Sequence, residues 1–575
     1  MDSKQTKTLL GVFAFVVFAW LISPLLLSRR EPAQPPSTSA LSFDAARAYA
    51  ATDEFVSQFP RRVLGSLESR QSTGYLHDRL QEMGYAITYA HFDARIARRK
   101  QVGRNVMGFK QGQSEEILAL IAHFDTAPTT NRGAMANGSG VGVLLELARV
   151  FSTIPTRRSL LIIFSDGGEY GSLGARDLAE SYPQRERIAA VLSLDYVGLG
   201  DLSAFRLEET GQLKGFAPPW LRQLAYQAAA TQGLPVETAS RIREHFERAI
   251  QISGADQGPF NAAGIPAINL GSISADRGRE KAVYHSAQDS IENLTNPSFG
   301  KFGRAAERIA RTLDELQSIP RESPESLKLW DGRYWMPKAG MVLHILGFLP
   351  LAVIFGFYAK NHHGKLNGLG IRRELLASIG TVLPFWAFLL SIGLARALRL
   401  IPTYSLYPAT AKDPVLLNPQ WNVLGSILGA ALFVAIVCGL IGIFSVRSLP
   451  KPDFSASKLV LLSLLVCIVV LALIYNSYWA TVFLLLPAWI WALVDCGKTL
   501  NARLKNGIWI LAAGIPFYAA MSIYGARLGL SWNFLWYQIL ALSSGMFTAA
   551  GYYLGIAGIA LGLRFLTIQF RRNEE

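Results

Sequence analysis

Cysteine is scarce in this chain and is confined to one region. The three cysteines among 575 residues, Cys438, Cys467 and Cys496, all lie in the apolar C-terminal part. Residues 1–437 therefore hold neither a disulfide framework nor a cysteine-ligated zinc site. Cysteine usage does not indicate the redox compartment.

Charged residues are also few, at 17%, whereas 50% of the residues are hydrophobic. The hydrophobic excess is concentrated in Leu9–Leu27 and after about Ala339, and the stretch between them is long enough to bury its own core. A net charge of +14 is compatible with nucleic acid, but much of the Lys and Arg lies in short loops between apolar runs. Such loops indicate orientation in a membrane, so we expect no nucleic-acid partner.

Eight apolar runs are expected to hold membrane spans, since crossing a hydrocarbon core of ~30 Å takes about 20 helical residues. The first, Leu9–Leu27, is expected to remain as an anchor because no small-residue cleavage site follows it. The last is expected to hold one span with an interfacial or kinked lead-in. The seven later runs are Ala339–Ala359, Leu375–Leu394, Val423–Val446, Leu459–Tyr475, Trp479–Val494, Ile508–Tyr524 and Trp532–Leu566.

Basic residues alternate along these runs. Lys4 and Lys7 precede the first, and further clusters follow the second, fourth, sixth and last, so all lie on one side if there are eight spans. The positive-inside rule makes that side cytoplasmic, with both termini. The segment after the first span then lies on the opposite face, which is periplasmic, external or luminal. A cytosolic domain is the alternative, and Arg29, Arg30 and Arg396 favour it.

The chain is therefore expected to have five parts. Residues 1–28 form an N-terminal transmembrane anchor and 29–40 a linker. Residues 41–318 form an extracytoplasmic domain, and 319–338 a second linker. Residues 339–570 form a bundle of about seven transmembrane helices.

Short apolar runs alternate with helical patterns in the expected domain. Continuous apolar runs bounded by polar residues are typical of strands buried on both faces. Four such runs are Ile117–Ala122, Leu160–Ser165, Ala189–Leu194 and Ile265–Leu270. Amphipathic patterns over Gly140–Phe151 and Leu173–Ser181 predict helices. The predicted fold class is α/β, a mostly parallel sheet flanked by helices, followed by an α-helical transmembrane bundle.

Polar side chains follow three of the predicted strands. Chemistry collects at this edge of a parallel sheet, and histidine and carboxylate side chains are zinc ligands. His245, in a polar segment elsewhere, is expected to be a solvated helix residue. The strand-end residues are His123, Asp125, Asp166, Glu169 and Asp195, and His285 comes later in the chain.

Five segments resemble, in order and spacing, the ligand segments of family 28 metallopeptidases. That family includes co-catalytic zinc aminopeptidases and, on the same fold, glutaminyl cyclases, and the resemblance covers roughly Leu41–Leu313. The segments are Ala122-His-Phe-Asp, Gly133-Ala-Met-Ala-Asn-Gly-Ser-Gly, Phe164-Ser-Asp-Gly-Gly-Glu-Tyr-Gly-Ser-Leu-Gly, Leu192-Ser-Leu-Asp and Tyr284-His-Ser-Ala-Gln-Asp. The implied zinc residues are His123 and Glu169 for one metal, Asp195 and His285 for the other, with Asp125 and Asp289 as carboxylates that orient the two histidines.

Two positions depart from the family's pattern. Ala136 stands where the carboxylate that bridges the metals is expected, and Gly168 stands where the general base should precede Glu169. Alanine cannot bridge two cations, and glycine cannot accept a proton from a metal-bound water. General-base assistance contributes about 10²–10⁴-fold. Peptidase chemistry is therefore predicted to be impaired or absent, with zinc bound once, twice weakly, or not at all.

One anchor, a peptidase-like domain and about seven further spans are also similar in layout to the Gaa-type attachment subunit of GPI-anchor transamidase. That resemblance implies an amine, peptide or lipid-linked substrate, bound at a lipid bilayer for amide-bond transfer or assembly. Two alternatives stay open. One is an active membrane-bound zinc aminopeptidase that hydrolyses N-terminal residues of peptides, and the other is a scaffold subunit of a membrane-protein complex.

Overall fold

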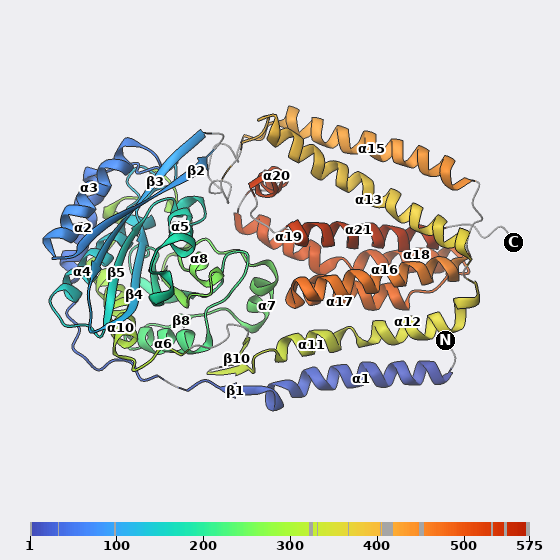
Figure 1. Ribbon diagram of the computed structural model, residues 1–575, viewed down its shortest axis with the longest axis horizontal. Helices are drawn as coiled ribbons and strands as arrows, with labels where there is room; N and C mark the ends of the chain where they lie inside the picture. Colours follow the sequence, from blue (N-terminus) through green and yellow to red (C-terminus); the bar gives the residue numbers. More distant parts are fainter. Residues whose placement is uncertain are drawn as a thin grey trace.

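The computed structural model describes residues 3–32, 34–96, 99–320, 326–330, 332–365, 367–402, 404, 418–447, 453–528, 530, 533–544 and 549–570. The chain folds into an α/β part and a helical part that lie end to end (Figure 1). The helical part combines the N-terminal helix α1 (Ser3–Leu26) with helices from the C-terminal half of the chain. The α/β part lies between these two segments in the sequence.

An eight-stranded sheet forms the centre of the α/β part, in the order β2-β3-β5-β4-β6-β9-β7-β8. The four predicted strands, β5, β4, β6 and β9, are neighbours and run parallel. β3 joins this group antiparallel to β5, and β7 joins it antiparallel to β9, so the complete sheet is mixed. The strands are β2 (Ala86–Ile96), β3 (Arg99–Lys110), β4 (Ser114–His123), β5 (Arg158–Ser165), β6 (Ile188–Leu194), β7 (Leu202–Glu208), β8 (Val236–Glu237) and β9 (Ala267–Ser274).

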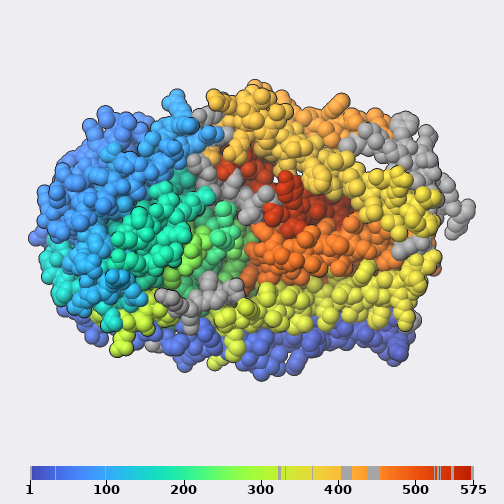
Figure 2. Space-filling view, viewed as in Figure 1, coloured from blue at the N-terminus to red at the C-terminus, as the bar shows by residue number. Residues whose placement is uncertain are grey.

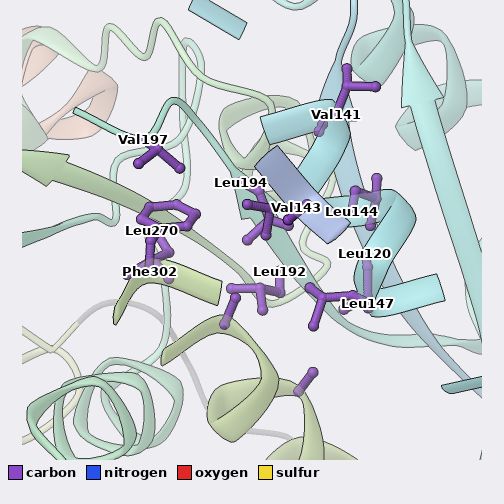
Figure 3. Close-up of a cluster of buried hydrophobic side chains, with 14 of the residues drawn as sticks. Leu120, Val141, Val143, Leu144, Leu147, Leu192, Leu194, Val197, Leu270 and Phe302 are labelled. Atoms are coloured by element: carbon purple, nitrogen blue, oxygen red, sulfur yellow. The ribbon is translucent and has the colours of Figure 1, made fainter. Parts of the chain in front are cut away.

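Helices cover both faces of this sheet. Alternate residues of the parallel strands point to opposite faces, and both sets are mostly apolar, which explains the continuous apolar runs. On one face, Leu120, Leu192 and Leu270 meet Leu144 and Phe302 (Figure 3). The helices of this face include α2 (Ala45–Gln58), α3 (Leu67–Glu82), α4 (Ser139–Ser152), α6 (Pro219–Ala230) and α10 (Asn296–Glu315), and the opposite face packs against α5 (Leu173–Ser181) and α8 (Gln257–Ala262).

The helical part contains five described helices that are long and apolar enough to cross a membrane, or six if the α18–α19 pair, bent by 43°, is one span. Eight were expected. Three further apolar helices, Trp421–Val437, Ser477–Leu493 and Phe534–Ser544, are shorter in the described residues. The helices are α11 (Ala339–Gly347), α12 (Leu349–His362), α13 (Gly368–Ala397), α15 (Trp421–Arg447), α16 (Phe454–Tyr475), α17 (Ser477–Leu493), α18 (Leu500–Ala512), α19 (Ile515–Leu528), α20 (Phe534–Ser544) and α21 (Ala549–Gln569).

A buried ion pair joins three of these helices. Arg564 of α21 contacts Glu374 of α13, and the Ser457 hydroxyl of α16 donates to the same carboxylate at 3.0 Å. Glu374 is fully buried and Arg564 nearly so. A charge in such surroundings is tolerated when it is paired, so this contact fixes α13 against α16 and α21.

A small three-stranded sheet connects the two parts. β1 (Ser28–Arg30), directly after α1, pairs antiparallel with β11 (Arg333–Trp335), directly before α11, and β10 (Lys328–Trp330) pairs with β11 on its other side. The chain therefore enters and leaves the α/β part at one place. From there α1 runs along the same edge of the helical part as α11 and α12, as the dark blue and yellow surfaces show (Figure 2).

An aromatic cluster lies next to this small sheet. His245 of α7 (Arg241–Ile250) packs there against Trp20, Trp335, His344 and Tyr478, which we call the junction cluster. The Nε2 atoms of the two histidines are 3.3 Å apart. The expectation that His245 is solvated was wrong. α7 is polar along most of its length, and the partners of its histidine face come from α1, β11, α11 and α17, which the local sequence does not contain.

Candidate site at the sheet edge

The structure brings the predicted ligands to the carboxyl edge of the parallel strands. His123 ends β4, Asp125 follows two residues later, and Asp195 follows β6. Glu169 lies in a short helical turn, Gly168–Tyr170, after β5, and His285 follows α9 (Arg277–Val283). We call these five residues the sheet-edge site.

The ligand side chains form two pairs. The Nε2 of His123 lies 3.7 Å from Oδ1 of Asp195, and the Nε2 of His285 lies 3.0 Å from Oε2 of Glu169. The resemblance implies that His123 shares one metal with Glu169, and Asp195 the other with His285; these direct contacts join the four side chains in the other combination, and the implied ligand sets stay a prediction. β4 lies between β5 and β6 in the sheet, so His123 has Asp195 on one side and the Glu169 turn on the other. Motif order along the chain cannot decide between these two neighbours.

Asp125 holds both His123 and the Glu169 turn in place. It is fully buried, and its Oδ1 lies 3.2 Å from Nδ1 of His123. The same carboxylate accepts the backbone N–H groups of Gly168 at 2.7 Å and of Glu169 at 3.2 Å. A carboxylate that fixes the second nitrogen of a histidine also sets the ring's orientation.

The Gly168 position has no room for a general base. A Cβ added there would lie 2.3 Å from Cγ and 2.5 Å from Cβ of His123. Any side chain at this position therefore requires His123 to move. The departure at Gly168 is more than a missing carboxylate, because the ring of His123 fills the space where that side chain would begin.

The Ala136 position is enclosed as well. Ala136 is 2% exposed, and its N–H donates to Oδ2 of Asp289 at 3.1 Å. Oδ1 of Asp289 accepts the N–H of Met135 at 2.6 Å. We expected Asp289 to orient His285, whereas these hydrogen bonds hold the 135–136 backbone. Burial raises the pKa of Asp289 to about 6, although the two N–H donors and the charge of His285 oppose that rise.

The neighbouring amide, Asn137, is also engaged. Its Oδ1 accepts the N–H groups of Gly140 at 3.1 Å and Tyr196 at 2.9 Å. Its Nδ2 donates to the carbonyl oxygen of Leu194 at 2.9 Å. Because Asn137 connects α4 to the end of β6 with both polar atoms, it is a poor substitute for the absent bridging carboxylate.

The surroundings of His123 shift its pKa upward. Burial lowers its pKa, but the hydrogen bonds and negative charges of Asp125 and Asp195 outweigh burial and raise the pKa well above the ordinary value. Asp166 does not take part in the site. Its carboxylate accepts the N–H groups of Gly167 and Arg104, at 2.9 and 3.2 Å, and so shapes the loop after β5.

The donor set does not fit an ordinary catalytic zinc centre. Such a centre uses three protein ligands and one open position, whereas each pair here offers two side chains. Among the residues that the structure describes, no three His, Cys, Asp or Glu side chains are grouped to hold a metal. One feature favours a cation beside the second pair. Oε1 of Glu169 is buried and accepts no hydrogen bond from any described group.

Sequence reasoning missed Asp256, which lies beside this site at the start of α8. It is 2% exposed and accepts the hydroxyl proton of Ser165, the last residue of β5. Burial raises its pKa, and the charge of His123 opposes that rise. No apolar run precedes Asp256 in the sequence, so no strand-end pattern drew attention to it.

The sheet-edge site faces the helical part. Tyr170, next to Glu169, is 2% exposed, and its ring stacks with that of Tyr404 at a centroid distance of 6.5 Å. Leu173 of α5 and Trp536 of α20 belong to the same apolar cluster. The turn that carries Glu169 is therefore packed between the sheet and the apolar helices.

The family match to known proteins lies in the α/β part. Residues 105–310, less than half of the chain, match the model of peptidase family M28. The BOS complex subunit NCLN of Canis lupus familiaris is 27% identical over 200 residues, which cover 32% of this chain and 35% of that protein. Aminopeptidase YwaD of Bacillus subtilis (strain 168) is 26% identical over 208 residues, covering 35% and 43%. The chain thus spans about a third of the NCLN relative's length.

Solved structures similar to this chain include a zinc aminopeptidase from Bacillus subtilis and a glutaminyl cyclase from Bacteroides thetaiotaomicron. The first is 16% identical, with a TM-score of 0.40, and covers 49% of this chain and 100% of that chain. The second is 23% identical, with a TM-score of 0.41, and covers 48% and 99%. The predicted resemblance of the α/β part to family 28 metallopeptidases is confirmed.

Proposed function

From the match of residues 105–310 to peptidase family M28, we propose that residues 41–318 form a peptidase-like domain with a degenerate site. This domain binds an amine, peptide or lipid-linked substrate for amide-bond transfer or for assembly of a membrane complex. The observation that carries the proposal is the close approach of His123 to Gly168, where a Cβ would lie 2.3 Å from the ring. A site built for a general base needs that space.

We propose that this site binds zinc weakly. His123, Glu169, Asp195 and His285 would hold it, and a bound ion would supply Lewis-acid polarisation of a carbonyl oxygen. No charged bridge joins the pairs, because Ala136 stands in that position. We therefore propose fewer than two tightly held ions per chain.

The membrane is part of the proposal. The apolar helices are compatible with a bilayer, and the basic loops support eight spans with both termini cytoplasmic and residues 41–318 extracytoplasmic. In Figure 1 the start of α1 and the end of α21 lie at the same end of the helical part, away from the α/β part. This layout also underlies the similarity to the Gaa-type subunit of GPI-anchor transamidase.

Two other functions have specific support. An active zinc aminopeptidase is favoured by the four family ligands that remain and by the similarity to an aminopeptidase of Bacillus subtilis. A scaffold role is favoured by relatives named as subunits of a BOS complex. The aminopeptidase does not explain why the Gly168 position is closed by His123.

Zinc stoichiometry of the full-length chain tests the proposal, with wild type and His285→Ala measured together with cleavage of aminoacyl substrates. We expect the wild type to bind zinc weakly and the variant to bind less of it. Neither should cleave the substrates above background. Substantial cleavage by the wild type would favour the aminopeptidase and overturn our proposal. Absence of zinc from both, with stable co-purifying proteins, would favour the scaffold.

Restoring the family residues gives a second test. Ala136→Asp and Gly168→Glu together should produce aminopeptidase activity only if His123 can move away from the added Cβ. Gly168→Ala separates the two effects, because it adds the Cβ without the carboxylate. If the double variant is folded and active while each single variant is inactive, the two departures account for the lost chemistry.

A further inference from the structure

A cavity of about 560 Å³ lies between the α/β part and the helical part. Its wall comes from the end of β7, helix α7, the segment from Ile252 to Gln257, and Ala520 and Ile523 of α19. Figure 1 shows α7 on the side of the α/β part that faces the helices. This volume is within the range of small-molecule binding sites.

One wall of the cavity carries a buried hydrogen-bond acceptor that has no donor among the described residues. Gln257 is fully buried, and its Nε2 donates to Ser253 at 3.0 Å and to the Thr210 carbonyl at 3.3 Å. Its Oε1 accepts no hydrogen bond from any group that the structure describes. A buried acceptor without a donor is costly, so a ligand N–H group here would be stabilising.

The carboxylates of the same wall differ in their partners. Glu247 is paired with Arg243 at 2.6 Å, and Glu209 is paired with Arg222 at 2.8 Å. Glu208, the last residue of β7, has no ion pair within 4 Å among the described residues. Burial and the charge of Asp195 raise its pKa to about 6, although the more distant charges of Arg206 and Arg243 oppose that rise. Glu208 is thus the carboxylate of this cavity that is open to a cation.

The remaining wall is apolar and continues onto the apolar helices. Ile242 and Phe246 come from α7, and Ile523 comes from α19. Ile242 is 70% exposed and Ile523 is 55% exposed. α19 belongs to the bent helix pair that is apolar enough to cross a membrane. An occupant therefore meets acceptors on one side and hydrocarbon-like side chains on the other.

We propose that this cavity binds a membrane amphiphile through a primary ammonium group, which faces Glu208 and Gln257 while the alkyl chain lies against Ile242, Phe246 and Ile523. The charges of Glu208 and Asp195 both act on Tyr284, the neighbour of His285. Binding itself needs no metal there. Only the use of the bound amine as a substrate rests on the proposed function.

Photo-crosslinking of the full-length chain in phosphatidylcholine nanodiscs tests this proposal. The probe is dodecylamine with a diazirine near the end of its alkyl chain, and the same chain as an alcohol is the matched ligand. We expect the amine to label α7 and the segment around Ile523. Glu208→Gln should reduce this labelling about tenfold, since charge-assisted hydrogen bonds are the strong ones. Glu186→Gln, on a side chain that is 86% exposed, should leave it unchanged.

Three results would overturn the proposal. They are equal labelling by amine and alcohol, no effect of Glu208→Gln in a folded variant, and protection by a hydrophobic peptide with a free N-terminus but not by phosphatidylethanolamine. The last result would assign the cavity to peptides. Labelling that persists in EDTA and in His285→Ala would leave the cavity site intact even if the zinc measurement fails.

Discussion

The sheet-edge site and the junction cluster each contain a largely buried histidine, and their surroundings shift the pKa values of the two rings in opposite directions. Burial disfavours the charged form of both. At His123 the carboxylates of Asp125 and Asp195 outweigh burial, and the pKa rises well above the ordinary value. At His245 burial outweighs the nearby Glu244, and the pKa falls to about 4. The difference shows that directly contacting carboxylates, more than depth, decide whether a buried histidine carries charge.

The largest effect on stability should come from removing Asp125, the buried carboxylate that contacts His123. Asp125→Ala deprives His123 and the N–H groups of Gly168 and Glu169 of a buried acceptor, and breaking a buried charged pair costs about 3–5 kcal/mol. Thermal unfolding in nanodiscs and hydrogen exchange of residues 168–169 measure this. Asp201→Ala, at an exposed carboxylate, serves as the control. An unchanged midpoint would mean that Asp125 does not hold the turn.

The neutral histidine of the junction cluster should make stability depend on pH. Because the pKa of His245 is lowered from 6.5 to about 4, the unfolded chain binds the additional proton between these values. The contribution of His245 to the free energy of unfolding is therefore fully present above pH 6.5. It falls by roughly 3 kcal/mol at most as the pH falls toward 4. Unfolding midpoints of wild type and His245→Phe at pH 7.5 and 5 measure this. Equal pH slopes in both proteins would contradict the assignment.

The smallest effect should come from Gly168→Ala, which forces His123 away from its place. We expect about 1–3 kcal/mol of destabilisation, as for overpacking of a core. Gly254→Ala is the matched control, since no atom lies within 4 Å of the Cβ it adds. If both variants unfold at the same temperature, the His123 ring moves without loss of stability. The argument that the general-base position is closed then fails.

The sequence predicted the centre of the sheet well because its pattern there is local. Four continuous apolar runs became β4, β5, β6 and β9, and the helix predicted over Leu173–Ser181 has these same bounds in the structure. β2 was not predicted, because Ala86–Ile96 alternates apolar residues with His91, Asp93 and Arg95 and does not form a continuous apolar run.

What escaped prediction depends on contacts between distant segments. The pairing of His123 with Asp195 follows from strand order, and the setting of His245 needs residues from four other elements. Arg564 and Glu374 are 190 residues apart, so neither gave a local sign of a buried ion pair. The presence of candidate ligands was readable from the motifs, but their partners were not.

Because β1 pairs with β11, backbone hydrogen bonds hold together the two chain segments that enter and leave the α/β part. A single proteolytic cut within 34–40 would leave both cut ends held, one through β1 and the other through β11 and α11. Such a cut would therefore break the chain covalently without releasing either piece from the small sheet.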